Sequence, residues 1–137
     1  MPVAVYRAPM RARDRESPVG EGAGFGLACG VVGIGDTLAR RVERLASLPD
    51  GVFVWTRDSG GWFHLGRVAG PYRLDESEAA RAVGIVHVRP CAWLDDPFSP
   101  DAVPAAVAAS FARGGRNLQQ IHGGSVEART LELWPAQ

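Results

Sequence analysis

The sequence predicts an α+β fold with a mostly antiparallel, curved or barrel-like sheet of five or six strands and two or three flanking helices. Two observations lead to this class. Short segments rich in β-branched and aromatic residues recur along the chain, and segments with helical spacing or helix-start signals lie between them. With 137 residues, 46% of them hydrophobic, the chain has the size of one compact domain spanning residues 1–137.

The first third of the chain predicts two strands and a helix. Val3–Tyr6 is a short apolar strand, and a loop rich in arginine and glycine follows it. The continuous small and apolar residues from Phe25 to Ile34 predict a buried strand. Leu38–Leu48 carries apolar residues at helical spacing and predicts an amphipathic helix, capped by Asp36 or Thr37.

A β-hairpin is the clearest element. Val52–Arg57 and Trp62–Val68 are rich in β-branched and aromatic residues, and the turn sequence Asp58-Ser59-Gly60-Gly61 separates them. Five further elements are expected: a short helix at Asp75–Ala82, a strand at Ile85–Arg89 that continues through Trp93 and Leu94, a helix at Val103–Ala112, a second short helix at Arg116–Ile121, and a last strand at Val126–Trp134.

All fifteen basic residues are arginines, and they balance fifteen acidic residues. The absence of lysine excludes a Walker A loop, a lysine Schiff base and a nuclease core with a catalytic lysine. Cys29 and Cys91 are too few for a disulfide framework and lie in apolar stretches, so buried free thiols are expected. Since no stretch reaches the roughly 18 apolar residues of a membrane span, a cytoplasmic location is expected.

Cofactor and metal motifs are incomplete. Gly33-Ile34-Gly35 lacks the third small residue of a dinucleotide-binding loop, and His64, His87 and His122 match no metal-ligand spacing. There is no Gly-x-Ser-x-Gly nucleophile elbow. The sequence therefore predicts neither a cofactor nor a metal, and no catalytic residue.

Arginines interleaved with aromatic residues point to nucleic acid. Arginine binds phosphate with two hydrogen bonds and stacks on bases, while tryptophan and tyrosine offer flat faces to an unstacked base. In Phe111–Gln120, two glycines between expected helices bring Arg113 and Arg116 together as a plausible phosphate clamp. The alternative is that Trp55, with its neighbours, belongs to the core and that the arginines form a solvated rim.

Several segments carry a family resemblance: Cys29–Gly35, Phe53–Asp58, Leu65–Val68 with Gly70–Arg73, His87–Pro90 and Phe111–Asn117. They resemble the N-terminal domains of bacterial HNH-type, type IV modification-dependent restriction endonucleases. Those domains belong to the PUA-like group that includes EVE, YTH and SRA domains. The resemblance covers nearly the whole chain and implies a small PUA-like barrel that reads modified DNA.

The implied activity is binding of double-stranded DNA that carries 5-methylcytosine, with the modified base flipped into an aromatic pocket. The cleaving HNH module would be covalently linked beyond Gln137, so this chain would be a reader and not an enzyme. The candidate base-pocket residues are Trp55, Trp62, Tyr72 and Asp36, although Asp36 also suits a helix cap. The candidate contacts to DNA backbone and groove are Arg57, Arg73, Arg89, Arg113, Arg116 and Asn117.

Two other functions stay open at this point. One is a small nuclease or hydrolase that uses His87 or His122 with Asp58. The other is a modified-RNA binder of the same fold. Trp62 and Tyr72 are expected to be more exposed than Trp55, because Trp62 opens its strand beside a glycine turn and Tyr72 follows Gly70-Pro71.

Overall fold

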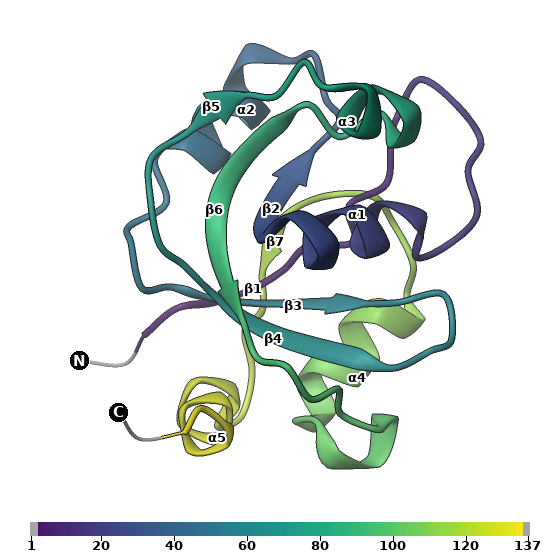
Figure 1. The fold of residues 1–137 in the computed structure, drawn as a ribbon. Helices are drawn as coiled ribbons and strands as arrows, with labels where there is room; N and C mark the ends of the chain where they lie inside the picture. Colours follow the sequence, from purple (N-terminus) through teal and green to yellow (C-terminus); the bar gives the residue numbers. More distant parts are fainter. Residues whose placement is uncertain (1–2, 136–137) are drawn as a thin grey trace.

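The computed structural model describes residues 3–135, which form an α+β fold around one curved sheet (Figure 1). The elements, in chain order, are β1 (Val5–Arg7), α1 (Glu21–Cys29), β2 (Val31–Ile34), α2 (Ala39–Ala46), β3 (Phe53–Arg57), β4 (Phe63–Val68), β5 (Arg73–Leu74), α3 (Glu78–Val83), β6 (His87–Trp93), the 3₁₀ turn η1 (Pro100–Ala102), α4 (Ala105–Ala112), β7 (Gln119–Gln120) and α5 (Val126–Leu133). The strand order is β2-β6-β4-β3-β1-β7, with β5 paired to β6. Among the described strands only β1 and β3 run parallel, which confirms the mostly antiparallel sheet.

The sheet curls at β6. Residues 87–90 of this strand pair with β2, and residues 91–93 pair with β4. β2 and β4 flank β6 on opposite sides, and the pairing passes from one side to the other at Pro90, which has no N–H to donate to a ladder. Figure 1 shows β6 as a long arc that joins the flat β3–β4 pair to the upper end of the molecule. The result is an open half-barrel, in agreement with the predicted curved or barrel-like sheet.

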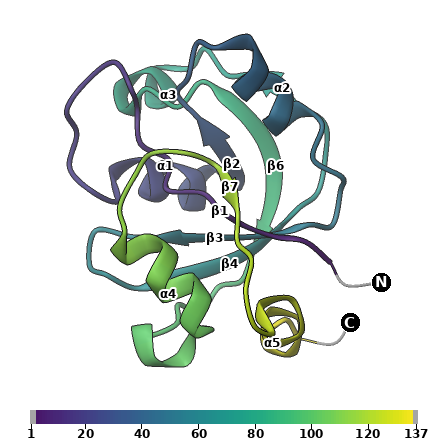
Figure 2. The ribbon, with the colours of Figure 1, turned by 180° about the vertical axis from the view of Figure 1, so that it is seen from behind.

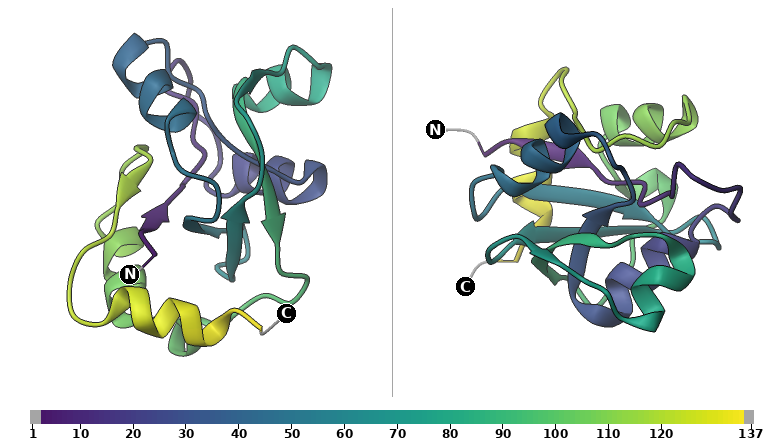
Figure 3. Two further views of the ribbon diagram at one scale, coloured as in Figure 1. Left: turned by 90° about the vertical axis from the view of Figure 1, so that its left-hand side faces the viewer. Right: turned by 90° about the horizontal axis from the view of Figure 1, so that it is seen from above.

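Helices cover the sheet on both sides and divide the core in two. One core lies among α1, α2 and α3 and includes Met10, Phe25 and Leu45. The other lies between the β1–β3–β4 surface and helices α4 and α5, and it includes Trp55 and Phe111. Figures 2 and 3 show α4 and α5 at one end of the curved sheet, with α2 and α3 at the other. Among the described residues, no helix has both the length and the apolar character needed to cross a membrane.

The sequence-based prediction for Phe25–Ile34 is wrong in its first half. Residues up to Cys29 belong to helix α1, and only β2 is extended. A run of small and apolar residues cannot by itself distinguish a buried helix from a strand. Here Gly22 and Gly26, four residues apart, let α1 pack directly on Met10, because a Cβ at Gly22 would lie 1.7 Å from the Met10 carbonyl oxygen. Gly30 then ends the helix with φ 67°.

The C-terminal predictions are also corrected. Residues 126–133 form helix α5 and not a strand, and the helix buries Val126 and Thr130, which lie four residues apart. The expected helix at Arg116–Ile121 is extended, and β7 within it pairs with β1. Five α-helices and seven strands are therefore present in residues 3–135, more than expected. Cys91 is buried as predicted, whereas Cys29 at the end of α1 is exposed.

The remaining expected elements are confirmed. The β3–β4 hairpin pairs Phe53 with Arg67 and Arg57 with Phe63. Helices α2, α3 and α4 and strands β1 and β6 lie where the sequence placed them, with ends shifted by a few residues. These elements share a strong local pattern, either alternation flanked by turn residues or apolar spacing of the helical kind.

Candidate nucleic-acid interface

A buried carboxylate marks the strongest candidate site. Asp36 follows β2 and precedes α2, and only 6% of its surface is exposed. Its Oδ1 accepts a hydrogen bond from the Leu38 N–H at 2.9 Å, while its Oδ2 accepts one from Nη1 of Arg41 at 2.7 Å. Nε of Arg13 also lies 2.7 Å from Oδ2. Burial acts to raise the pKa of Asp36, but the hydrogen bonds from Leu38 and Arg41 and the charge of Arg13 outweigh it and hold the pKa below its usual value.

Asp36 forms one wall of a small pocket, which we call the Asp36 pocket. Its lining comes from the loop after β1, the end of β2, helix α2 and the segment before β7: Arg11, Arg13, Ile34, Gly35, Asp36, Arg41, Arg44, Arg116, Asn117 and Leu118. Arg13 bridges the pocket, since it contacts Asp36 on one side and donates a hydrogen bond to Oδ1 of Asn117 on the other. Only about 20 Å³ is open to the centre of a water molecule. The pocket as it stands therefore has room for about one water.

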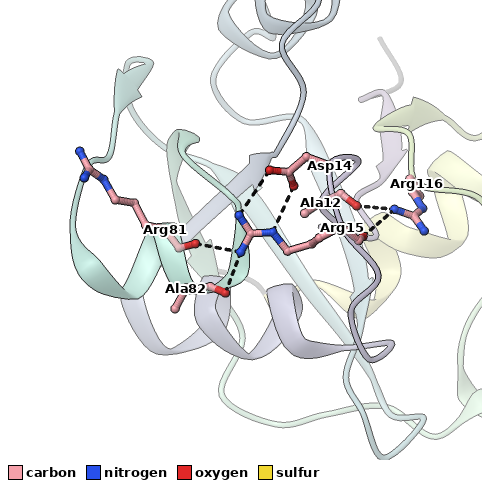
Figure 4. Close-up of polar contacts among 6 residues, drawn as sticks. All are labelled: Ala12, Asp14, Arg15, Arg81, Ala82 and Arg116. Atoms are coloured by element: carbon pink, nitrogen blue, oxygen red, sulfur yellow. Dashed lines mark hydrogen bonds and ion pairs between the residues drawn. The ribbon is translucent and has the colours of Figure 1, made fainter.

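The loop that carries Arg11 and Arg13 is held from two sides (Figure 4). Nη1 of Arg116 donates to the carbonyl oxygens of Ala12 and Arg15. Arg15 in turn donates to the carbonyls of Arg81 and Ala82 at the end of α3, both at 3.2 Å. This loop thus connects α3 to the segment before β7, and these contacts hold the backbone of Arg13 beside the pocket.

A second hollow adjoins the first and shares Arg11 with it. We call it the arginine cleft, and its walls are Arg7, Pro9, Arg11, Val19, Gly20, Arg57, Phe111, Ala112, Gly114 and Gly115. It contains about 220 Å³ of space open to the centre of a water molecule. The two hollows lie side by side along the loop that follows β1, and guanidinium groups line both.

The structure brings three predicted site residues together and adds several that the sequence did not indicate. Asp36, Arg116 and Asn117 all line the Asp36 pocket. Arg57 lines the arginine cleft, and Arg73 and Arg113 are exposed on β5 and after α4. The added residues are Arg7, Arg11, Arg13, Arg41 and Arg44. The amphipathic pattern of Leu38–Leu48 gives no sign that Arg41 and Arg44 line a pocket, whereas the clustering of arginines at 11, 13 and 15 was the available signal for the loop.

The predicted aromatic base pocket is not assembled. Trp55 is fully buried and donates from Nε1 to Oγ1 of Thr130 at 3.2 Å, so its prediction as a base contact is wrong and the core alternative is correct. Tyr72 is half-buried, and its hydroxyl lies 2.8 Å from Nδ1 of His87 with the two rings stacked. Trp62 is 47% exposed at the β3–β4 turn, which confirms the expected order of exposure. No aromatic side chain is among the described residues that line the Asp36 pocket.

Arg89 has a structural role, which corrects its prediction as a DNA contact. Only 4% of it is exposed. Its Nη1 donates to the carbonyls of Leu45 and Leu48 at the end of α2, and its Nη2 donates to Oδ1 of Asp50. These hydrogen bonds hold the C-terminal end of α2 against β6. They use the donors of the buried guanidinium, so Arg89 is not placed to bind a phosphate.

The residues of the alternative enzyme are paired with other partners. Oδ2 of Asp58 lies 2.8 Å from Nε2 of His64, a neighbour in the same hairpin, and not from His87 or His122. Nδ1 of His87 lies within hydrogen-bond distance of the Tyr72 hydroxyl, and His122 is exposed. Within residues 3–135, no three histidine, cysteine or acidic side chains gather in a group that could hold a metal ion.

Comparison with known proteins places the fold. The chain resembles the YTH domain of the MRB1 protein of Zygosaccharomyces rouxii, solved in complex with N6-methyladenosine RNA, with a TM-score of 0.54 and 15% sequence identity. The likeness covers 96% of this chain and 86% of that one. The fold is YTH-like. This bears out the PUA-like architecture that the sequence resemblance implied, while the HNH restriction context stays a prediction.

Searches by sequence give no further assignment. No family model matches the chain. No curated protein matches it either. At 15% identity the structural likeness is one of fold, so the function has to be argued from the side chains of the site.

Proposed function

We propose that this chain is a non-catalytic reader of modified nucleic acid and that the Asp36 pocket receives the base. The observation that supports this is the buried Asp36 carboxylate, placed between Arg13 and Arg41 and beside apolar Ile34 and Leu118. A binding role also fits the YTH-like fold, whose solved relative holds a modified RNA.

The chemistry of the pocket suits a base with an exocyclic amino group. A carboxylate accepts hydrogen bonds from the N4 amino group of cytosine, and a guanidinium donates to ring nitrogen or carbonyl oxygen atoms. Ile34 and Leu118 supply apolar surface for a methyl group. We therefore propose DNA with 5-methylcytosine as the ligand, and the recognition domain of a modification-dependent restriction endonuclease as the context.

Arg13 must move for a base to enter. The free space fits about one water, and Arg13 fills the gap between Asp36 and Asn117. Arg13 is about one-third exposed on a loop, so its side chain can rotate outward without disturbing the core. The incoming amino group would replace the Arg13 guanidinium at Oδ2, and the released arginine would be free to bind phosphate. Flipping the base out of a duplex costs a few kcal/mol, least for a mismatched or unpaired base.

One observation favours a second ligand, RNA with N6-methyladenine. The solved YTH relative is in complex with N6-methyladenosine RNA. Adenine presents the same neighbouring pair of groups as cytosine, an amino donor beside a ring-nitrogen acceptor. The Asp36 pocket can therefore address either base through one set of contacts, and the binding experiment below includes both.

The test is a set of binding titrations with matched oligonucleotides. DNA duplexes that differ only in cytosine methylation are compared with RNA strands that differ only in adenine methylation. We expect tighter binding of the methylated DNA by several-fold, since one buried methyl group contributes about 0.8 kcal/mol. An equal affinity for every modified and unmodified pair would contradict the reader function, and a preference confined to RNA would select the second ligand.

Variants locate the preference within the chain. Asp36→Asn removes the charge but keeps an acceptor oxygen and the shape, so we expect base discrimination to fall while general affinity persists. Asp75→Asn is the matched control, because Asp75 lines neither hollow and its Oδ1 likewise accepts a hydrogen bond from a backbone N–H, that of Ser77. Circular dichroism would check that both variants are folded. Discrimination that survives Asp36→Asn undiminished would place the base elsewhere.

A further inference from the structure

We propose that the arginine cleft is a phosphate-binding site, with Arg7, Arg11 and Arg57 as its ligands. The ligand class rests on the proposed function, in which a phosphodiester next to the base in the Asp36 pocket would occupy the cleft. The site itself rests on a separate observation. Nε of Arg7 and Nε of Arg11, two residues that line the cleft, are buried and have no hydrogen-bond partner among residues 3–135.

Arg7 is the central residue. It ends β1, and only 5% of it is exposed. Nη1 donates to the carbonyl of Ser110 at 2.7 Å and to that of Gly114 at 2.8 Å, which fixes the side chain against the end of α4. Its Nε is buried and has no hydrogen-bond partner among residues 3–135. An unpaired buried donor of this kind is costly, and for a charged group the cost is larger.

Arg11, on the loop that follows β1, repeats the pattern in the same cleft. Its Nε is likewise buried and without a partner among the described residues. Nearly all buried polar atoms in folded proteins are hydrogen-bonded, so two unpaired N–H groups on residues that line one hollow favour an acceptor supplied from outside the described chain. Only an acceptor can satisfy both donors.

The positive charge in the cleft also favours an anionic ligand. No aspartate or glutamate is among the described residues that line it, and Arg7, Arg11 and Arg57 form no ion pair within residues 3–135. Burial lowers the pKa of Arg7, and the positive charge of Arg113 lowers it further. An anion would compensate these like charges, whereas in the Asp36 pocket a carboxylate of the chain already does so.

Arg57 is placed to complete the site. Its guanidinium carbon lies 5.9 Å from the centre of the Phe63 ring and 5.6 Å from that of Phe111. These cation–π contacts orient the side chain at the rim of the cleft without using its N–H donors. Because the cleft offers about 220 Å³ and shares Arg11 with the Asp36 pocket, one strand can place a base in the pocket and a neighbouring phosphate in the cleft.

The first experiment detects the anion directly. Inorganic phosphate is titrated into the whole chain at constant ionic strength, with chloride as the reference anion, and the arginine Nε–Hε signals are followed by NMR. Variants Arg11→Gln and Arg57→Gln assign their own signals by loss. We expect the Arg7 and Arg11 signals to shift and that of Arg89 to stay, because Nε of Arg89 already donates to the carbonyl of Gly70. Equal shifts at Arg89, or none at Arg7 and Arg11, overturn the site.

The second experiment uses an oligonucleotide without a base at its centre. Arg11→Gln and Arg57→Gln should each weaken binding of abasic and ordinary strands by about tenfold, as expected for one lost charge-assisted hydrogen bond. Each should also reduce the slope of log affinity against log salt by about one. Arg40→Gln is the matched control, since Arg40 is exposed on α2 and lines neither hollow.

The outcomes separate this site from the base-reading function. Unchanged affinity in Arg11→Gln and Arg57→Gln, together with altered base preference in Asp36→Asn, overturns the cleft and leaves the reader intact. Phosphate-induced shifts at Arg7 and Arg11 in a protein that binds no oligonucleotide support the cleft as an anion site and overturn the reader. A tenfold loss in Arg40→Gln as well would show general charge attraction and overturn the cleft.

Discussion

Arg89 and Arg7 are both buried, yet their surroundings differ in kind. Arg89 donates to four carbonyl oxygens and to the carboxylate of Asp50. Arg7 donates to two carbonyl oxygens, has an Nε without a partner among residues 3–135, and lies near the positive charge of Arg113. Burial alone therefore does not distinguish a structural arginine from a binding one. The useful distinction is whether the protein itself supplies acceptors for every N–H group.

The sharpest way to break this comparison is to truncate Arg89. Arg89→Ala leaves Asp50 and three carbonyls around the C-terminal end of α2 without their donor. We expect a loss of about 3–5 kcal/mol in the free energy of unfolding. Asp50 is exposed, so the loss comes from the backbone carbonyl groups left without their donor, at about 1–3 kcal/mol for each buried one. Urea denaturation measures it. A loss below 1 kcal/mol would mean that Arg89 is not structural.

Arg7→Met should cost less stability, about 1–3 kcal/mol, because it removes two hydrogen bonds but also an unpaired donor and a repulsive charge. The same denaturation series provides the comparison with Arg89→Ala. Oligonucleotide affinity of the folded variant should fall by about tenfold or more. If Arg7→Met proves as unstable as Arg89→Ala, the two arginines contribute equally to the stability of the fold.

Asp36 provides an intermediate case, in which a carboxylate of the chain compensates the arginines. Since the folded state depresses the pKa of Asp36, the ionised group stabilises the fold above its unfolded pKa of about 4, and this stabilisation disappears as the pH falls through the lower folded pKa. Asp36→Asn should therefore lower the unfolding free energy by about 1–2 kcal/mol at pH 7. The difference from wild type should shrink below pH 4. A difference independent of pH would mean that the ion pairs contribute nothing.

Trp62→Ala should have the smallest effect on stability, within about 0.5 kcal/mol, because the ring is half exposed at a turn. Trp62 shares the β3–β4 hairpin with Arg57, so we keep it as a stacking residue at the edge of the interface. The variant should lose about 1 kcal/mol of affinity for single-stranded DNA. Fluorescence titration of wild type and variant tests this, and equal affinities would remove Trp62 from the interface.

The sequence predicts the fold better than the site, for physical reasons. The β3–β4 hairpin and helix α2 carry local patterns that need no distant partner. The apolar pattern from Phe25 predicts a strand where the structure has the second half of helix α1, because the α1 glycines allow packing on Met10 and no local pattern shows that contact. Trp55 and Arg89 lie within strands that also carry candidate binding residues, and only tertiary contacts reveal that both are buried.

The site follows the same division. Asp36, Arg116 and Asn117 were predicted and do converge, because each lies beside a helix end or a glycine turn. Arg11 and Arg13 were missed, since their role depends on a loop that other parts of the chain hold in place, and Arg7 was missed because its surroundings come from the distant end of α4. Residues whose function arises from long-range backbone contacts leave little trace in a single sequence.

The close contact between Gly22 and Met10 gives helix α1 a remote influence on binding. One added methyl group at Gly22 would force the Met10 carbonyl away from its present position. Arg11 and Arg13 follow Met10 directly along the chain, so they would shift together without any change of charge or of ligand-contacting side chain. A substitution at position 22, in helix α1, could therefore change ligand preference although this residue lines neither hollow.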